Sequence, residues 1–196
     1  MADGVALAEP DTPTRAARRA QIMSSSAIDW DMWTVVLLKP DCLRRGLADE
    51  VLDVVRLHLD IVDRRTVLPA EAQIFAHYDD ILHRSTALGR DVPAELRRIY
   101  VGQPAGIALA HGIQAALRLR VVLGPTDPAA APPGTIRGRF GTDSLAAAMR
   151  DGRLIDNLIH SSDTADAAAR DFDIWYGPQH RHLLGRPHVP TPGRTS

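Results

Sequence analysis

The sequence predicts an α/β fold, more closely an α+β sandwich, with a ferredoxin-like βαββαβ core, an antiparallel sheet and added helices. Two observations predict this class. Short apolar, β-branched runs alternate with segments of helical periodicity. The chain also has 196 residues, of which 45% are hydrophobic and 24% are charged, values ordinary for a globular protein with one real core.

Four segments read as strands because they are apolar and bounded by turn residues, and Pro40 ends the first of them. These strands are expected at 34–38, 61–68, 107–110 and 158–159. Helices are expected where apolar residues recur at helical spacing or where proline opens a segment. These helices cover 48–59, 70–82, 93–100, 112–122 and 164–175.

The stretch 124–157 does not fit this alternation. Four prolines and four glycines lie near its start, within 124–141, and an Ala-rich segment follows at 145–149. A loop of this length in a compact domain is either a misread element or a functional loop, and the composition favours the second. The segment 135–138 presents a hydroxyl and a guanidinium next to glycines, which suits an anionic ligand.

The two ends read as peripheral. Residues 1–30 are expected to form a flexible leader, or an arm that packs on a neighbouring subunit, and 31–178 to form the domain. Residues 179–196 form a Pro/His-rich tail, whose histidines we expect to be solvated rather than metal-bound.

Composition excludes several classes of protein. The 23 basic and 24 acidic side chains give a net charge of −1, so there is no electrostatic reason to expect a nucleic-acid or anionic-membrane partner. The longest apolar run, 35–38, is far shorter than the ~20 residues of a membrane span. A single cysteine, Cys42, excludes an internal disulfide framework and a multi-cysteine zinc site. We therefore expect a cytoplasmic protein.

Common catalytic motifs are absent, which excludes simple P-loop NTPases, α/β-hydrolases and His-Glu-x-x-His metalloproteases. Lys39, the one lysine among 23 basic residues, precedes a proline and so cannot belong to a P-loop. A lysine that persists in an arginine-rich chain suggests a site that needs a compact ammonium, and chance is the alternative.

His160 ends a predicted strand and precedes a polar turn. A histidine that attacks phosphorus must be neutral, with one ring nitrogen free and the other held by an acceptor. Asp171, eleven residues further on in the next helix, could turn back toward this ring. Lys39, Arg120 and Arg137 could supply the cations that phosphoryl transfer requires. The alternatives are a structural or solvated histidine, an exposed helix carboxylate and surface arginines.

Several motifs in the same order resemble the nucleoside diphosphate kinase family over residues 32–178. They are Leu38-Lys39-Pro40-Asp41 with Arg45-Gly46, the segments 120–129 and 133–138, Asn157-Leu158-Ile159-His160-Ser161-Ser162-Asp163, and Trp175-Tyr176-x-Pro178. Motifs that recur together in order are far more specific than any single one.

The resemblance implies a ping-pong transfer of the terminal phosphate of ATP to a nucleoside diphosphate, with His160 as the phosphorylated nucleophile. It places Tyr78 near the transferred group, Ser162 beside the nucleophile, and Asp171 where the family has a glutamate that orients the imidazole. It assigns phosphate contacts to Lys39, Arg120, Thr126 and Arg137, and ribose contacts to Lys39 and Asn157. Mg²⁺ would arrive with the nucleotide, with Asp163 as an outer-shell partner through water. The family also implies a homo-oligomer, a dimer-based tetramer or hexamer.

The sequence departs from the family pattern in four places. Ser161 stands where the family has glycine, and Asp171 is one methylene shorter than glutamate. The base-stacking phenylalanine has no counterpart, and about ten additional residues precede Asn157, so Leu154 is a candidate for the other wall of the base site. Two further hypotheses therefore remain: a divergent enzyme with a narrowed or altered nucleotide substrate, and a catalytically weakened nucleotide-binding or assembly module.

Overall fold

The computed structural model describes residues 28–83 and 91–185, so most of the predicted leader and the end of the tail lie outside the described residues. The sheet has four strands, β1 (Trp33–Leu38), β2 (Asp60–Val67), β3 (Ala105–His111) and β4 (Ile159–Ser161), in the order β2-β3-β1-β4. Every neighbouring pair is antiparallel. The predicted α+β class with an antiparallel sheet is therefore confirmed.

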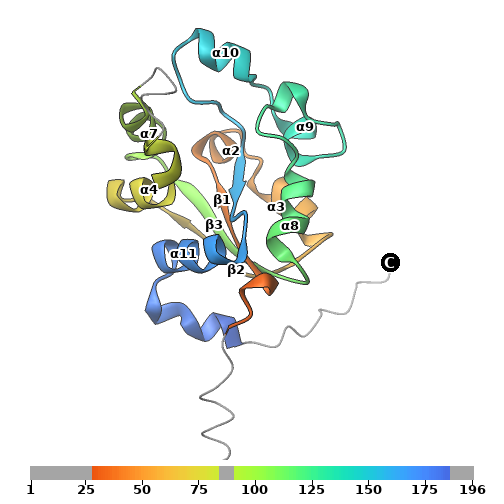
Figure 1. Ribbon diagram of the computed structural model, residues 1–196. Helices are drawn as coiled ribbons and strands as arrows, with labels where there is room; N and C mark the ends of the chain where they lie inside the picture. Colours follow the sequence, from red (N-terminus) through yellow and green to blue (C-terminus); the bar gives the residue numbers. More distant parts are fainter. Residues whose placement is uncertain (1–27, 84–90, 186–196) are drawn as a thin grey trace, which may run out of the picture.

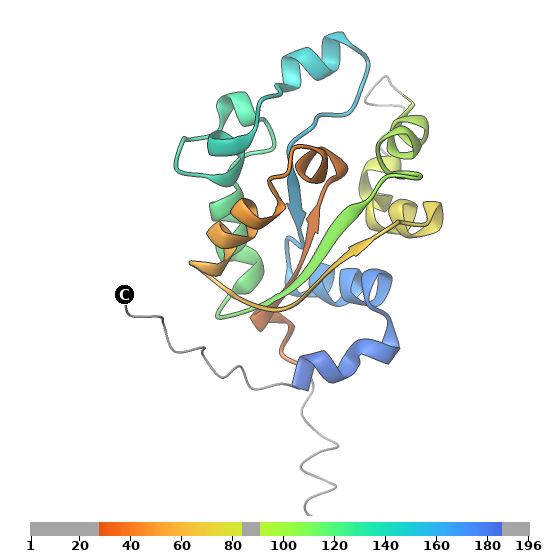
Figure 2. The same ribbon diagram turned by 180° about the vertical axis from the view of Figure 1, so that it is seen from behind.

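Helices cover both faces of this sheet (Figures 1 and 2). Successive side chains of a strand point to opposite faces. Val35 and Leu37 of β1 accordingly pack in one apolar cluster, and Val36 and Leu38 in the other. The first cluster includes side chains of α4 (Glu71–His77), α7 (Val92–Tyr100) and α11 (Ala165–Trp175), and the second includes side chains of α3 (Ala48–Arg56) and α8 (Ala115–Leu123).

The shorter elements account for the differences from the sequence-based expectation. The helix expected at 70–82 is interrupted at Tyr78, where the backbone leaves the helical region, and continues as α5 (Asp79–Leu82). A short helix that was not expected, α2 (Pro40–Arg44), begins with its proline at the first helical position, where the missing N–H costs nothing.

The stretch expected to be a long loop contains a 3₁₀ turn, η2 (Pro128–Ala130), and two short helices, α9 (Ile136–Phe140) and α10 (Leu145–Arg150). The Thr135 and Ser144 hydroxyls begin the two helices by accepting hydrogen bonds from the backbone N–H of Gly138 and Ala147, both at 3.1 Å. Figure 1 shows α10 beyond one end of the sheet, on the same side as α9 and α7.

Two 3₁₀ segments flank the domain. The first, η1 (Trp30–Met32), leads into β1, and the second, η3 (Pro178–Gly185), follows α11. Part of the region expected to be a solvated tail therefore packs on the domain, since Leu183 is buried and His180 Nε2 lies 2.9 Å from Arg65. None of the helices in the described part of the chain has the length and hydrophobicity to cross a bilayer.

Candidate active site

A cavity of about 460 Å³ opens at the end of the sheet where β1 finishes and β4 starts. Seven of the residues singled out in the sequence line it, although they come from five separate stretches of the chain. They are Lys39, Tyr78, Thr126, Arg137, Leu154, Asn157 and His160. The structure therefore brings most of the predicted site together. Ser162 and Asp171 are buried outside the lining, and Arg120 and Asp163 lie elsewhere on the surface.

His160 lies within β4, paired with Leu37 of the central strand β1, so its backbone is fixed by the sheet. The imidazole is partly exposed to the cavity. Burial, and secondarily the neighbouring His77, lower its pKa from 6.5 to about 3. The ring is therefore neutral at pH 7, the form in which a ring nitrogen keeps the lone pair needed for attack.

The backbone just before His160 is held in an unusual conformation. Leu158 has a φ of +69°, in the left-handed region that side chains other than glycine rarely adopt. Its N–H donates to the buried Asp41 carboxylate at 3.0 Å, and its carbonyl accepts from the Lys39 N–H at 2.8 Å. Contacts of this kind around a strained residue are typical of functional sites. Here these hydrogen bonds fix the backbone between Asn157 and His160, and with it the directions of their side chains.

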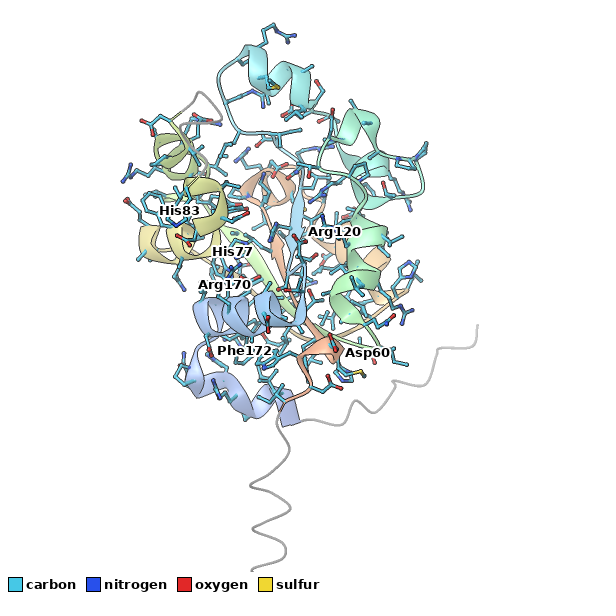
Figure 3. The ribbon with its side chains drawn as sticks, in the orientation of Figure 1. Asp60, His77, His83, Arg120, Arg170 and Phe172 are labelled. Atoms are coloured by element: carbon cyan, nitrogen blue, oxygen red, sulfur yellow. The ribbon has the colours of Figure 1, made fainter. Side chains whose placement is uncertain are left out.

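His77 lies between Asp171 and the nucleophile candidate. Its ring meets the His160 ring edge-on, with centroids 4.6 Å apart, and its Nδ1 lies 3.2 Å from Asp171 Oδ1. In Figure 3, His77 of α4 and Arg120 of α8 lie to either side of β4. Among the described residues, no hydrogen bond joins Asp171 to His160. The carboxylate expected to orient the nucleophile directly is thus bonded to another histidine.

Asp171 is nevertheless ionised. Burial raises its pKa, but the interaction with His77 and the hydrogen bond from Ser162 outweigh burial, so the pKa lies below its ordinary value. Ser162 Oγ donates to Asp171 Oδ2 at 2.8 Å. The other oxygen, Oδ1, accepts only a long hydrogen bond from Arg170 at 3.4 Å. A closer donor there favours a proton on His77 Nδ1 over the alternative, an Nδ1 that accepts from Trp175 Nε1 at 3.2 Å.

Lys39, at the end of β1, is buried in the cavity wall. Its Nζ donates to the Ile155 carbonyl at 2.7 Å and to Asn157 Oδ1 at 3.1 Å. The Asn157 amide in turn donates to the Thr126 carbonyl at 3.0 Å, so three predicted residues are linked in one chain. Burial lowers the pKa of Lys39, which the neighbouring Asp41 partly opposes.

Arg137 is buried and supports the same wall from α9. Its two terminal nitrogens donate to the carbonyls of Gly124 and Ile159, both at 2.8 Å, while its Nε is buried without a partner among the described residues. Burial is the main cause that lowers its pKa. The loop can close this tightly only because Gly138 lacks a Cβ, which would lie 2.1 Å from the Pro132 carbonyl.

The remaining predicted residues have other partners. The Arg120 guanidinium and the Asp163 carboxylate form an exposed ion pair at 2.8 Å. The Tyr78 hydroxyl lies 2.6 Å from the Tyr100 hydroxyl, and burial raises the pKa of both phenols. Ser161, which replaces the family glycine, is a buried residue of β4 opposite Val36, and its φ is not positive. The strand therefore accepts a side chain at that position.

Sequence reasoning missed some lining and supporting residues. His77 belongs to none of the motifs identified in the sequence, and the one signal that points to it is its position next to Tyr78. The apolar part of the lining, which includes Ile81, Leu96 and Ile99, reads in sequence as ordinary core. Leu145 and Met149, in the Ala-rich segment, also line the cavity.

Known proteins match this chain over the whole site. The family model described as nucleoside diphosphate kinase matches residues 33–181. A nucleoside diphosphate kinase of Pyrobaculum aerophilum is 31% identical over 73% of this chain and 93% of the relative. One of Streptomyces griseus subsp. griseus is 34% identical over 73% of this chain and 94% of its own length.

Solved structures agree with these sequence matches. A transition-state mimic of the nucleoside-diphosphate kinase from Borrelia burgdorferi, with bound vanadate and ADP, superposes with a TM-score of 0.67 at 31% identity, covering 75% of this chain and 88% of that one. The NDP kinase of Pyrobaculum aerophilum gives a TM-score of 0.62 at 30% identity, over 76% of this chain and 97% of that chain. The chain described here belongs to the nucleoside diphosphate kinase family and is an enzyme of the phosphotransferase class.

Proposed function

We propose that the enzyme transfers the terminal phosphate of ATP to a nucleoside diphosphate through a phosphorylated His160. A ring nitrogen attacks the γ-phosphorus, a P–N bond forms, and the P–O bond to ADP breaks. An oxygen of the acceptor diphosphate then attacks the same phosphorus and releases the imidazole. One observation carries this proposal: the neutral, partly exposed imidazole lies in a cavity lined by Lys39 and Arg137.

The cavity wall supports the role of each further residue. The Lys39 ammonium and the Arg137 guanidinium, both in the lining of the cavity, would receive phosphate oxygens. Asn157 and Thr126 line the same wall and suit ribose and phosphate contacts, respectively. Tyr78 lies beside the nucleophile, its ring centroid 5.9 Å from that of His160. Arg120 would leave Asp163 and turn toward the phosphates when a nucleotide binds.

Mg²⁺ fits this site as an ion brought by the nucleotide. The phosphate-facing part of the cavity presents cations rather than a set of carboxylates, so the phosphates and water would hold the ion. When bound, Mg²⁺ neutralises the charge that gathers on the phosphate oxygens. Asp163, exposed on the surface in its ion pair with Arg120, would hold one of its waters once Arg120 has turned away. An Asp163→Asn variant is expected to need several-fold more Mg²⁺ for half-maximal phosphorylation, whereas an unchanged requirement would remove Asp163 from this role.

Assembly and location complete the proposal. We propose a homo-oligomer, a dimer-based tetramer or hexamer, because β2 is an edge strand and Leu117 and Val121 expose apolar surface on α8. The buried Cys42 carries a free thiol, which agrees with a reducing compartment such as the cytoplasm.

The test is to incubate the enzyme with Mg²⁺ and γ-labelled ATP, and then add unlabelled GDP. We expect label on the protein that is labile to acid and stable to base, and that moves to GTP. His160→Ala should abolish the label, and His58→Ala, which removes an exposed histidine after α3, should leave it unchanged. Label retained in His160→Ala would exclude this nucleophile. ATP binding without any label in the unaltered enzyme would favour the nucleotide-binding or assembly module.

A further inference from the structure

Two apolar side chains on α10 are exposed where a short surface helix would ordinarily carry polar ones. Leu145 is 41% exposed and Met149 is 60% exposed, whereas Ala148 between them is buried. Residues four apart lie on the same face of a helix, so the pair forms one apolar face. That face lines the 460 Å³ cavity that also contains His160.

The position of α10 is fixed by polar contacts on both sides. The Asp143 carboxylate, two residues before the helix, forms a two-point ion pair with Arg153 at 2.6 and 2.8 Å and accepts from the Asp156 N–H at 3.0 Å. These contacts hold the pKa of Asp143 well below its usual range. The Leu154 N–H donates to the Glu95 carboxylate of α7 at 3.1 Å. These contacts therefore fix the segment that contains α10 internally and also bind it to α7.

Other parts of the cavity lining are aliphatic as well. Ile81 of α5 and Leu96 and Ile99 of α7 contribute to it, while the phosphate-binding candidates Lys39 and Arg137 supply its polar part. A ligand that fits this division has an anionic end and a flat apolar end with two faces, as a nucleotide has. A ring between two aliphatic walls gains contact over both faces without an aromatic partner.

We infer that Leu145 and Met149 form one wall of the base site, so that α10 replaces the missing aromatic ring with aliphatic contacts. This inference rests on the proposed function, because it takes a nucleotide as the ligand. The contacts depend on apolar area rather than on hydrogen bonds. Purine diphosphates should therefore bind more tightly than pyrimidine diphosphates.

The experiment compares ADP with inorganic tripolyphosphate, which carries phosphates and no base, by calorimetry on the full chain. In Leu145→Ala/Met149→Ala, ADP affinity should fall on the order of tenfold, as expected for the apolar contact removed, while tripolyphosphate affinity stays within about twofold. Leu57→Ala/Leu68→Ala removes two aliphatic side chains that are more exposed than Leu145 and Met149 and do not line the cavity, and should change neither affinity. Met149→Phe, which restores a ring, should tighten ADP several-fold.

The outcomes separate this inference from the proposed function. Unchanged ADP affinity in the double variant, or equal weakening of ADP and tripolyphosphate at an unchanged melting temperature, would overturn the base wall. The variants could show the expected ADP affinities while the unaltered enzyme takes up no label from ATP. In that case the proposed transfer fails and the base wall stands. An unaltered enzyme that binds no ADP would overturn both.

Discussion

Asp171 Oδ1 lies 3.2 Å from His77 Nδ1, and the ring of His77, not the carboxylate, contacts His160. The Asp171 side chain ends at the imidazole of His77. His77 is thus a positioning residue, and the orientation of His160 depends on a carboxylate that it does not touch.

Asp171→Asn tests this dependence. The neutral amide still accepts from Ser162 but no longer attracts the proton on His77 Nδ1, so His77 and with it the His160 ring lose their fixed orientation. We expect the rate of protein labelling by γ-labelled ATP, in a single turnover, to fall on the order of 10- to 100-fold, with a stability loss of about 1–3 kcal/mol for the buried contacts. Asp166→Asn, an exposed position on the same helix, should change neither quantity. A labelling rate within twofold of the unaltered enzyme would contradict the role.

The depressed pKa of His160 makes stability depend on pH. Its pKa is about 3 in the folded enzyme and near 6.5 in the unfolded chain. Between these values the unfolded state binds more protons, so the free energy of unfolding falls as pH is lowered from 6.5 toward 3. At pH 5 this contribution reaches at most about 2 kcal/mol.

His160→Gln removes that titration. We therefore expect the variant to lose less stability than the unaltered enzyme between pH 7 and pH 5, as measured by urea unfolding at both values. The comparison of the two differences cancels every other titrating group. Equal losses would mean that His160 titrates near its ordinary pKa in the folded enzyme.

Lys39 combines a functional need with a buried charge. Lys39→Met keeps most of the length of the side chain, removes the ammonium from the lining of the cavity, and leaves the Ile155 carbonyl without its donor. The relief of charge burial and the loss of the hydrogen bonds oppose each other, so the free energy of unfolding should change by less than about 2 kcal/mol. Labelling should fall at least ~100-fold.

Lys39→Arg separates charge from shape at the same position. It keeps the positive charge, but a planar guanidinium does not reproduce the compact donor that fits between Ile155 and Asn157. We expect it to recover less than a tenth of the lost activity. Full activity in Lys39→Arg would show that the site needs only a positive charge, and that the lysine survives there by chance.

The sequence predicts the parts of this enzyme that depend on local pattern. The four strands are expected within a few residues of their observed bounds, because apolar and β-branched runs mark them directly. Seven candidate residues meet in one cavity, and some of them, such as Lys39 and His160, lie at strand ends that the pattern also marks. The α4–α5 break at Tyr78 and the short helices α9 and α10 were not expected, because each depends on a single capping or backbone event.

Pairings across the fold lie beyond local pattern. Nothing in the spacing of Asp171 and His160 reveals that His77, more than 80 residues earlier, lies between them. Leu145 and Met149 likewise belong in the sequence to an Ala-rich segment of an expected loop, and the Asp143–Arg153 and Glu95–Leu154 contacts that fix this segment join residues far apart in the chain or in the loop. Such contacts join residues that are far apart in the sequence, so local sequence patterns do not reveal them.

Arg137 links the loop to the strand that carries the nucleophile, since its guanidinium bonds the carbonyls of Gly124 and Ile159. Arg137→Ala leaves these two carbonyls without their charged donor and opens a void beneath α9. We expect the free energy of unfolding by urea to fall by about 2–4 kcal/mol, because hydrogen bonds from charged groups contribute about 1.5–3 kcal/mol each and nearby water recovers part of the loss.

The matched control is Arg139→Ala on the same helix. Within residues 28–83 and 91–185, the Arg139 guanidinium contacts only the Phe140 ring, 4.8 Å from the ring centroid, so its loss should cost less than about 1 kcal/mol. Arg137 donates to the carbonyl of Ile159, the residue before His160. The Arg137→Ala variant should therefore be labelled more slowly than its weaker ATP binding alone explains. Saturating ATP should not restore the labelling rate. Full recovery at saturating ATP would limit Arg137 to phosphate binding and remove its part in placing the nucleophile.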